Sequence, residues 1–335
     1  MRSLLKQMII SKTPYRVSFF GGGTDYPKWY KNNKKGGKTI SCSIDKFSYI
    51  VLKKLPNAFK YKYRIRYLLR EETKNIKRIK HPTIRNIFKI LKINIPLEII
   101  HYGDLPAATG IGSSSAFTVG LLNAFNQFFS YKWSKKKIYQ LAVHIEQNLN
   151  KENVGSQDQI ISSLGGFRVI NFKKKKIITS DLKQYKKNLS KIENNSFLIY
   201  SGIQRESSLV TKDLISNINK KGKTYKKLYK LTIECEKLIK SKNFTIEKFG
   251  KLLNESWNLK KTTSKLITNK KINEICSKCL KNKAIGVKLL GAGSGGFVLV
   301  VAKKNAQLRI KKMFKKSYHF PLKISYGGSK IICHE

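Results

Sequence analysis

The sequence predicts an α+β fold divided into two domains. The chain has 335 residues, about twice the usual domain length of roughly 150 residues. Its hydrophobic residues make up 41% and its aromatic residues 11%, enough for packed cores, which excludes a wholly disordered chain. Strand-like and helix-like segments alternate without a regular βαβ order, which favours α+β over a doubly wound sheet. We expect domains at 1–190 and 191–335, joined by a polar linker near 185–195.

The first elements are expected to be strands. Residues 8–20 alternate apolar and polar side chains in their second half, as a half-buried strand does. Three glycines end this strand, and a second strand follows the next glycine pair and continues through 47–52. Residues 61–80 are mixed in pattern and very basic. A helix over 83–91 and a strand over 96–102 come next.

Two helices have the clearest pattern in the chain. The first covers 114–129, with apolar residues at helical spacing and a serine as its expected N-cap. The second is capped by Ser134, and its apolar stripe runs as far as Leu149. Residues 1–7 precede the first strand without any motif, and we expect them to be a dispensable extension.

The second half of the chain predicts a mixture of both element types. A hairpin is expected from 167–172 and 177–179, and a strand at 196–200. Helical patterns follow near 208–240 and 245–260. Two apolar strands, 284–290 and 297–302, flank a glycine loop.

The charge of the chain is strongly positive. Lys and Arg number 69 against 19 Asp and Glu, a formal net charge of +50, which indicates an anionic substrate or partner. Much of this charge is lysine in runs rich in Asn and Ile, so we interpret most of it as composition bias on a solvated surface. The alternative from another functional class is a nucleic-acid-binding protein, but the sequence contains no recognisable DNA- or RNA-binding module. We expect no specific nucleic-acid partner.

Cysteine usage and hydropathy suggest a cytoplasmic protein. The five cysteines are odd in number and scattered, unlike a disulfide framework. Cys276 and Cys279 have the spacing of half a zinc site, but no matching second pair exists, so buried thiols are expected. The N-terminus lacks a signal-peptide pattern, and no run of about 18 apolar residues predicts a spanning helix. We therefore expect no membrane partner, while the oligomeric state stays open.

The strongest chemical motif is the segment LPAATGIGSSSA at 105–116. Its glycines let the backbone approach an anion, and its serines add hydroxyl groups. The helix that follows offers free N–H groups and the positive end of its dipole to a phosphate. The alternative is a serine-capped helix after a flexible turn. The motif is not a Walker loop, because no Gly-Lys-Ser/Thr ends it.

A second glycine loop, at 291–296, has no dinucleotide-binding context. It contains a loose Gly-x-Gly, but the next segment predicts a strand and not a helix. The strand–turn–helix order that a dinucleotide fold requires is therefore missing. A tight turn packed near an active site remains compatible with the pattern.

Two carboxylates stand out because acids are scarce. Glu146 lies at the edge of the apolar stripe of the second helix, and Asp158 follows a glycine turn in VGSQDQI. A carboxylate, a serine at a phosphate-binding helix and nucleotide phosphates together suit Mg²⁺, which binds few protein oxygens plus phosphate. From spacing alone, surface acids are an equally good interpretation.

Three motifs in order give the sequence a family resemblance. They are TPYRVSFFGGGTD at 13–25, PAATGIGSSSA at 106–116 and KLLGAGSGGF at 288–297. With them the chain resembles the GHMP small-molecule kinases, named for galactokinase, homoserine, mevalonate and phosphomevalonate kinases. The resemblance spans about residues 8–333. It implies a two-domain fold with the active site in the cleft between the domains, and ATP and Mg²⁺ as cofactors.

Three further sequence features indicate which subgroup of the family the chain resembles. GGGTD in the first motif, SGIQRESS at 201–208 and PLKISYGGSKII at 321–332 resemble the D-glycero-D-manno-heptose 7-phosphate kinases and related fucokinase domains. The heptose-phosphate group implies phosphorylation of the anomeric hydroxyl, giving the 1,7-bisphosphate for nucleotide-activated heptose synthesis. The alternatives are a fucokinase-like or other sugar-1-kinase, and a sugar sensor on the same fold that has lost catalysis.

The resemblance also implies roles for single residues. Asp158 would be the base or orienter beside the acceptor hydroxyl, and Arg16 would neutralise phosphate. Ser114 and Glu146 would hold Mg²⁺. The ATP phosphates would be wrapped by Gly110, Ile111, Gly112, Ser113, Ser114 and Ser115. The sugar phosphate would be bound by Gly23, Thr24, Asp25, Gly202, Arg205, Gly293 and Ser294.

Overall fold

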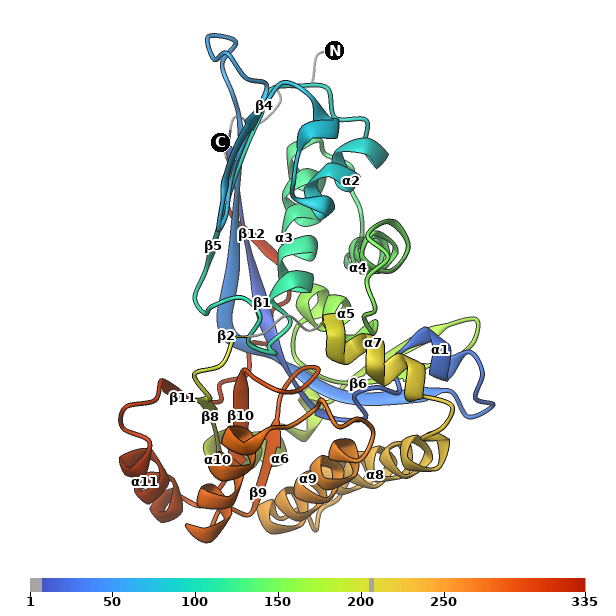
Figure 1. Cartoon of the computed structure of the whole chain (residues 1–335), viewed down its shortest axis with the longest axis vertical. Helices are drawn as coiled ribbons and strands as arrows, with labels where there is room; N and C mark the ends of the chain where they lie inside the picture. The colour runs from blue at the N-terminus through green and yellow to red at the C-terminus, as the bar shows by residue number, and fades with distance from the viewer. Residues whose placement is uncertain (1–7, 205–207, 335) are drawn as a thin grey trace.

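Two β-sheets with helices around them form the framework of the chain (Figure 1). The computed structural model describes residues 8–204 and 208–334. The expected extension at 1–7 and the predicted site residue Arg205 lie outside these described residues. Mixed helices and sheets confirm the α+β class predicted from the sequence.

The larger sheet has eight strands and is built on a long antiparallel pair. β1 (Met8–Phe20) pairs with β2 (Gly37–Lys54), with Val17 opposite Cys42. β2 is 18 residues long, so its first part pairs with β6 (Phe167–Phe172) and its second with β5 (Leu97–Gly103). The sheet is completed by β3 (Tyr63–Arg66), β4 (Arg70–Thr73), β7 (Ile177–Asp181) and β12 (Lys330–His334).

The last strand of the chain belongs to this first sheet. β12 runs antiparallel to β1, with Ile10 opposite Cys333, so the described ends of the chain lie side by side (Figure 1). The sequence does not predict the pairing of β12 with β1, because pairing between strands so far apart in the chain leaves no local pattern. The domain boundary predicted at residue 190 remains a prediction.

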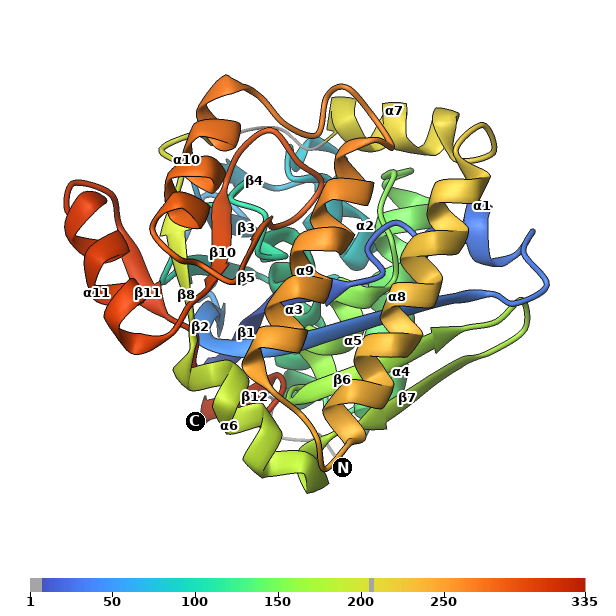
Figure 2. The same ribbon diagram turned by 90° about the horizontal axis from the view of Figure 1, so that it is seen from below.

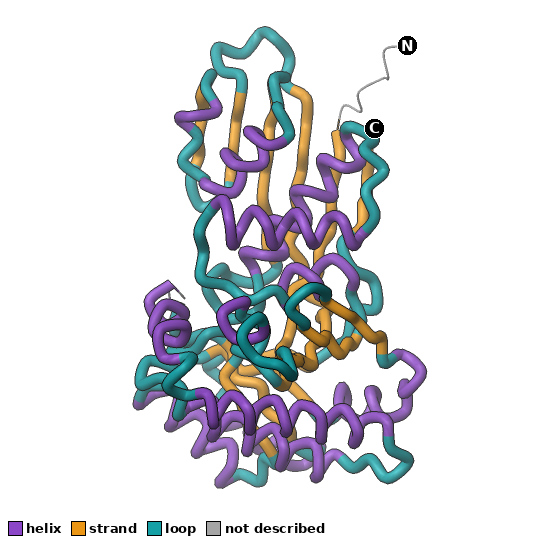
Figure 3. The backbone as a smooth tube through the Cα atoms, turned by 90° about the vertical axis from the view of Figure 1, so that its right-hand side faces the viewer, coloured by secondary structure: helices purple, strands orange, loops and turns teal. Residues whose placement is uncertain are grey.

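Helices cover one face of the large sheet (Figure 3). They are α2 (Pro82–Ile90), α3 (Ser113–Phe128), α4 (Lys135–His144) and α5 (Gln157–Leu164). α3 lies against the sheet and has twelve buried residues. The serine N-cap expected for α3 is wrong: Gly112 is the N-cap, at φ 74°, and no side chain caps the helix. The predicted cap of α4 is confirmed, since Ser134 accepts a hydrogen bond from the Lys137 N–H.

The end of the second predicted helix is not α-helical. Ile145–Leu149 forms a π-helical turn, in which the Asn150 N–H donates to the Ile145 carbonyl at 2.8 Å. Such wide turns inside helices are rare and occur often at functional sites. This turn carries Glu146, and it departs from the continuous α-helix that the apolar stripe predicts.

The smaller sheet lies below the large one and has four strands. Its order is β11 (His319–Pro321), β8 (Ser196–Tyr200), β10 (Phe297–Val301) and β9 (Gly286–Leu289). The strands expected near 196–200, 284–290 and 297–302 are thereby confirmed. Four further helices are α1 (Pro27–Tyr30), α7 (Ser208–Asn217), α10 (Lys270–Lys281) and α11 (Lys304–Met313).

Two long helices connect the smaller sheet to the larger one. α8 (Gly222–Lys240) and α9 (Ile246–Lys261) lie next to each other beneath β1 and β2 (Figure 2). Phe249 of α9 packs edge-on against Phe19 of β1, with ring centroids 5.8 Å apart. Because α9 is fixed in this way, its last turn lies at the end of β1, where the first glycine motif begins.

The linker predicted at 185–195 is wrong. Lys186–Asn194 forms the helix α6, with Leu189 and Ile192 fully buried. Asn188 donates its side-chain amide to the Ile239 carbonyl at 2.9 Å. Two apolar residues at helical spacing are enough to fix this helix to the core, although its other residues are mostly Lys and Asn.

The buried positions predicted for Cys276 and Cys279 are confirmed. All five cysteines are free, and Cys276 and Cys279 are buried on α10. Within the described part of the chain, no group of three or more His, Cys, Asp or Glu residues is placed to hold a metal. No helix among residues 8–204 and 208–334 combines the length and apolar character needed to cross a membrane.

Candidate active site

A cleft of about 1310 Å³ lies between the two halves of the chain. Its lining comes from the first glycine turn, the second glycine motif, the π-turn, α5, α9 and the third glycine loop. The predicted site residues that line it are Arg16, Gly23, Asp25, Gly110, Gly112, Ser113, Ser114, Ser115, Glu146, Asp158 and Gly293. The cleft therefore brings together parts of all three sequence motifs.

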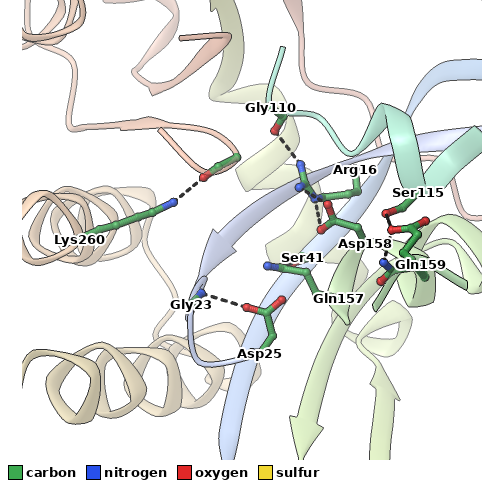
Figure 4. Close-up of polar contacts among 12 residues, drawn as sticks. Arg16, Gly23, Asp25, Ser41, Gly110, Ser115, Gln157, Asp158, Gln159 and Lys260 are labelled. Atoms are coloured by element: carbon green, nitrogen blue, oxygen red, sulfur yellow. Dashed lines mark hydrogen bonds and ion pairs between the residues drawn. The ribbon is translucent and has the colours of Figure 1, made fainter. Parts of the chain in front are cut away.

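An ion pair between Arg16 and Asp158 lines this cleft, and Figure 4 shows the two side chains facing each other. The Arg16 Nε donates to Asp158 Oδ1 at 2.6 Å, and its Nη2 donates to the second carboxylate oxygen. The remaining Nη1 donates to the Gly110 carbonyl at 2.7 Å. Asp158 lies in the first turn of α5 rather than in a loop. The arginine therefore fixes both the carboxylate and the glycine loop beside it.

The second glycine motif lies directly over this ion pair. A Cβ on Gly112 would lie 3.1 Å from Arg16 Cγ and 3.3 Å from Asp158 Oδ2, and the residue has a φ of 74°. Only glycine fits both the space and the left-handed backbone. α3 begins immediately afterwards, so its unpaired N–H groups are available for an anion.

Glu146 is a buried carboxylate with an incomplete set of partners. Its Oε2 accepts hydrogen bonds from Ser115 Oγ at 2.8 Å and Gln159 Nε2 at 2.6 Å. Its Oε1 is buried and has no hydrogen-bond partner. Burial, followed by the nearby charge of Glu152, raises the pKa of Glu146 to about 8. The serine on Glu146 is therefore Ser115, while Ser114 is exposed and lines the cleft.

These residues fit a divalent cation. A buried carboxylate oxygen without a partner is unfavourable when ionised, because it has lost its water and gained nothing in return. A hard cation beside it removes this penalty. Glu146 and Ser114 line the same cleft next to the helix α3 N-terminus, which is the arrangement of few protein oxygens plus phosphate that Mg²⁺ prefers.

Asp25 ends the first glycine turn and is almost fully buried. It is 2% exposed, and its Oδ1 accepts a hydrogen bond from the Gly23 N–H at 3.0 Å. Burial, and then the negative charge of Asp158, raises the pKa of Asp25. A Cβ on Gly155 would lie 1.8 Å from Asp25 Oδ2. The second carboxylate oxygen therefore lies against a bare backbone, and the residue lines the cleft.

Two lysines in the cleft were not predicted from the sequence. Lys288 Nζ donates to the carbonyls of Ser18 at 2.8 Å and Phe19 at 2.5 Å, and Lys260 Nζ donates to the Gly291 carbonyl at 2.6 Å. Lys288 opens the third motif, which was a usable signal. Lys260 has no such signal, since it is one lysine among many in a chain of charge +50.

An aromatic end of the cleft was also missed. The His81 ring stacks on Phe117 with centroids 4.8 Å apart, and His101 meets the same phenyl ring edge-on at 5.0 Å. Burial lowers the pKa of both histidines to about 4, so both rings are neutral at pH 7. This end of the cleft adjoins the second glycine motif, and isolated histidines in the sequence do not predict their stacking.

Several predicted residues do not line the cleft. Thr24 is fully buried and donates to the Gly21 carbonyl at 2.7 Å, so it holds the turn together. Ile111 is buried in the core. Gly202 lines a smaller cavity of about 400 Å³, and Ser294 donates its hydroxyl to the Leu266 carbonyl.

Comparison with known proteins identifies the family. The profile described as GHMP kinases N terminal domain matches residues 76–166, and that described as GHMP kinases C terminal matches residues 236–319. Together the two matches cover just over half of the chain. A D-glycero-alpha-D-manno-heptose 7-phosphate kinase of Campylobacter jejuni is 27% identical, over 95% of this chain and 96% of that protein.

A second relative and one solved structure are also similar to the chain. An L-fucokinase/L-fucose-1-P guanylyltransferase of Bacteroides fragilis is 26% identical over 66% of this chain, which corresponds to 24% of that protein. The crystal structure of a D-glycero-D-manno-heptose 1-phosphate kinase from Bacteroides thetaiotaomicron has the same fold, with a TM-score of 0.78. It is 18% identical and covers 97% of this chain and 99% of that one. The glycine motifs, the cleft and the two profile matches lead to one conclusion: the chain belongs to the GHMP kinase family.

Proposed function

We propose that this kinase transfers the γ-phosphoryl group of ATP to the anomeric hydroxyl of D-glycero-D-manno-heptose 7-phosphate. The product would be the 1,7-bisphosphate, an intermediate for nucleotide-activated heptose. The observation that carries the proposal is the Arg16–Asp158 pair, held under the α3 glycine loop and next to Asp25. The choice of heptose 7-phosphate is supported by the near full-length similarity to the Campylobacter jejuni enzyme.

Asp158 would receive the acceptor hydroxyl and Arg16 would neutralise phosphate charge. The transition state of phosphoryl transfer is loose, so it depends mainly on alignment and on charge neutralisation. Arg16 holds the carboxylate through two nitrogens and reaches the glycine loop with the third. Asp158 is therefore oriented before substrate binds, and it accepts the hydroxyl proton late in the reaction.

The nucleotide would lie along the second glycine motif. The N–H groups at the start of α3 would bind its phosphates, because a helix N-terminus favours anions. The neighbouring aromatic end, with His81 and Phe117, would contact the base. Ring stacking suits a purine without requiring specific hydrogen bonds.

Ser114 and Glu146 would hold Mg²⁺, with Ser115 and Gln159 orienting the carboxylate through Oε2. Bound Mg²⁺ would shield the charge of the ATP phosphates during transfer. Glu146 would supply Oε1 as a ligand, and the burial of this oxygen would keep competing water away from it.

Asp25 would bind sugar hydroxyls on the other side of the acceptor. Its Oδ1 is held by the Gly23 N–H, which leaves the carboxylate in one fixed orientation. Gly293 lines the same cleft from the third glycine loop. We expect the enzyme to act in the cytoplasm, without a specific nucleic-acid or membrane partner.

A fucokinase-like activity is the second candidate, supported by the similarity to the Bacteroides fragilis protein. The test is a magnesium-ATP phosphorylation assay with heptose 7-phosphate, fucose, galactose and mannose as acceptors. We expect the highest kcat/KM with heptose 7-phosphate and a product phosphorylated at the anomeric carbon. Efficient phosphorylation of fucose, with heptose 7-phosphate inactive, would replace the first candidate by the second.

A further inference from the structure

An amide side chain lies between the two aspartates of the cleft. Gln157 is the first residue of α5 and directly precedes Asp158. It is 7% exposed and lines the cleft, and Figure 4 shows it between Asp158 and Asp25. A buried amide needs partners for both its oxygen and its nitrogen, because burial removes its hydrogen bonds to water.

The protein fixes only the oxygen end of this amide. Ser41 Oγ, on β2, donates to Gln157 Oε1 at 2.8 Å, and Ser41 is fully buried. The oxygen therefore points toward the sheet, and the Nε2 end of the amide points away from Ser41. Among residues 8–204 and 208–334, no group accepts a hydrogen bond from Nε2. The two N–H bonds of this nitrogen are thus available to a molecule bound in the cleft.

A second polar side chain on the same wall also lacks a protein partner. Ser18 of β1 lies directly opposite Ser41 in the antiparallel pair, so the two side chains are on the same face of the sheet. Ser18 is 6% exposed and lines the cleft. Its Oγ is buried and has no hydrogen-bond partner in the described part of the chain. The Ser18 hydroxyl and the Gln157 amide therefore make this wall complementary to a polar group.

The chemistry of Gln157 favours a hydroxyl as this polar group. Its amide carries no charge, whereas the strong hydrogen bonds to phosphate come from charged donors. The neighbouring Asp25 repels an anion whenever its carboxyl group is ionised. A hydroxyl is neutral, accepts a hydrogen bond from an amide N–H and donates one to an oxygen such as Ser18 Oγ.

The place of Gln157 in the chain indicates which hydroxyl it contacts. We propose that Gln157 donates Nε2 to the C2 hydroxyl of the acceptor and thereby selects a sugar that carries this hydroxyl. The inference rests on the proposed function, in which the anomeric hydroxyl lies at Asp158 and Asp25 binds other sugar hydroxyls. Gln157 is adjacent to Asp158, with Cα atoms about 3.8 Å apart, and the C2 hydroxyl is the nearest hydroxyl to the anomeric one. Ser41 acts as a positioning residue, because it fixes the orientation of the amide.

The test compares Gln157→Met with Gln140→Met. Methionine is similar in length to glutamine but has no N–H to donate, and Gln140 is an exposed glutamine of α4. Binding of heptose 7-phosphate, of its 2-deoxy analogue and of a non-hydrolysable ATP analogue is measured by calorimetry, without turnover. We expect the wild type and Gln140→Met to bind the 2-deoxy sugar about 10-fold more weakly, the size of one hydrogen bond between neutral groups. Gln157→Met should bind both sugars equally well and the ATP analogue as the wild type does.

A failure of this inference differs from a failure of the proposed function. A wild type that binds both sugars equally well overturns the inference, and so does a Gln157→Met variant that still prefers the 2-hydroxy sugar 10-fold. A wild type that does not bind heptose 7-phosphate overturns the proposed substrate, and the pair of fucose and 2-deoxyfucose then decides the role of Gln157 by the same ratio. Should Gln157→Met not fold, Gln157→Glu keeps an acceptor for Ser41 without the amide donor and is judged by that ratio.

Discussion

The guanidinium of Arg16 holds both carboxylate oxygens of Asp158, although the two residues are 142 positions apart in the sequence. The third nitrogen of the same side chain binds the Gly110 carbonyl. One side chain therefore sets the relative positions of β1, the second glycine motif and α5. In the proposed mechanism the acceptor hydroxyl would lie at the lone pairs of Asp158 that Arg16 leaves free.

Asp158→Asn should reduce turnover with little change in sugar affinity. The amide keeps the shape of the carboxylate but cannot accept the proton, so the interaction that is lost belongs to the transition state. General-base contributions are about 10²- to 10⁴-fold in rate, and the fall in kcat should lie in that range. Asp181→Asn is the matched control, because Asp181 forms a similar ion pair with Arg168 elsewhere. An Asp158→Asn enzyme with wild-type kcat would contradict the assignment.

Asp25→Asn should act mainly on sugar binding. The side chain is held by the Gly23 N–H, and Asn can keep this hydrogen bond through its own Oδ1. What is lost is the charge that strengthens hydrogen bonds to sugar hydroxyls, worth about 1.5–3 kcal/mol. Calorimetric titration with heptose 7-phosphate measures the loss directly. If Asp25→Asn changes only kcat and Asp158→Asn changes only affinity, the two roles are reversed.

Glu146→Gln should lower turnover by orders of magnitude and yet stabilise the magnesium-free protein at alkaline pH. The pKa of Glu146 is raised to about 8, above the ordinary value near 4.3. Between these values the folded state keeps a proton that the unfolded state has lost, so the free energy of unfolding falls as pH rises. Glutamine does not titrate, so the variant lacks this fall in the free energy of unfolding.

Thermal denaturation at pH 5 and at pH 8.5 checks the Glu146 prediction. Without Mg²⁺, the Tm advantage of Glu146→Gln over wild type should appear at pH 8.5 and be small at pH 5. Added Mg²⁺ with an ATP analogue should raise the Tm of the wild type more than that of the variant, because ligands stabilise the state that binds them. Equal magnesium effects on both proteins would remove Glu146 from the metal site.

His101 should make the protein acid-sensitive. Burial lowers its pKa from 6.5 to about 4, and the neighbouring His81 contributes to this shift. The unfolded state takes up a proton below pH 6.5 while the folded state does not, so stability present above pH 6.5 is lost as pH falls toward 4. Each unit of pKa difference corresponds to about 1.4 kcal/mol, so His101→Gln should show a smaller fall in Tm between pH 7 and pH 5. His144→Gln, at an exposed position, is the control and should behave as the wild type.

The sequence predicts the elements of this fold better than their connections. The long helix after the second glycine motif, the 167–172 hairpin strand and the strands near 196–200 and 297–302 all follow from local periodicity. The pairing of β12 with β1 does not, because contacts over the whole length of the chain leave no periodic signal. The same holds for α6, where two buried apolar residues override a polar composition.

The sequence also predicts some residues of the candidate site and not others. Several glycines and carboxylates of the motifs could be predicted to lie together, and they line the same cleft. Lys260 could not, because a chain with so many lysines hides the one that is buried in the cleft. The hydrogen bond from Ser115 to Glu146 depends on the rotation of α3, which starts at Gly112 without a side-chain cap.

Gly155→Ala should weaken sugar binding through Asp25, a residue 130 positions earlier in the chain. A Cβ on Gly155 would lie 1.8 Å from Asp25 Oδ2 and 2.5 Å from Cγ, far inside contact distance, so the carboxylate must move. Overpacking of this kind destabilises by about 1–3 kcal/mol, and the displaced carboxylate should lose as much sugar affinity as Asp25→Asn does. Gly327→Ala is the control, because its Cβ meets no atom within 4 Å. Calorimetry with heptose 7-phosphate and thermal denaturation separate the two effects: a Gly155→Ala protein that is destabilised but binds the sugar phosphate normally would show that Asp25 does not contact the acceptor.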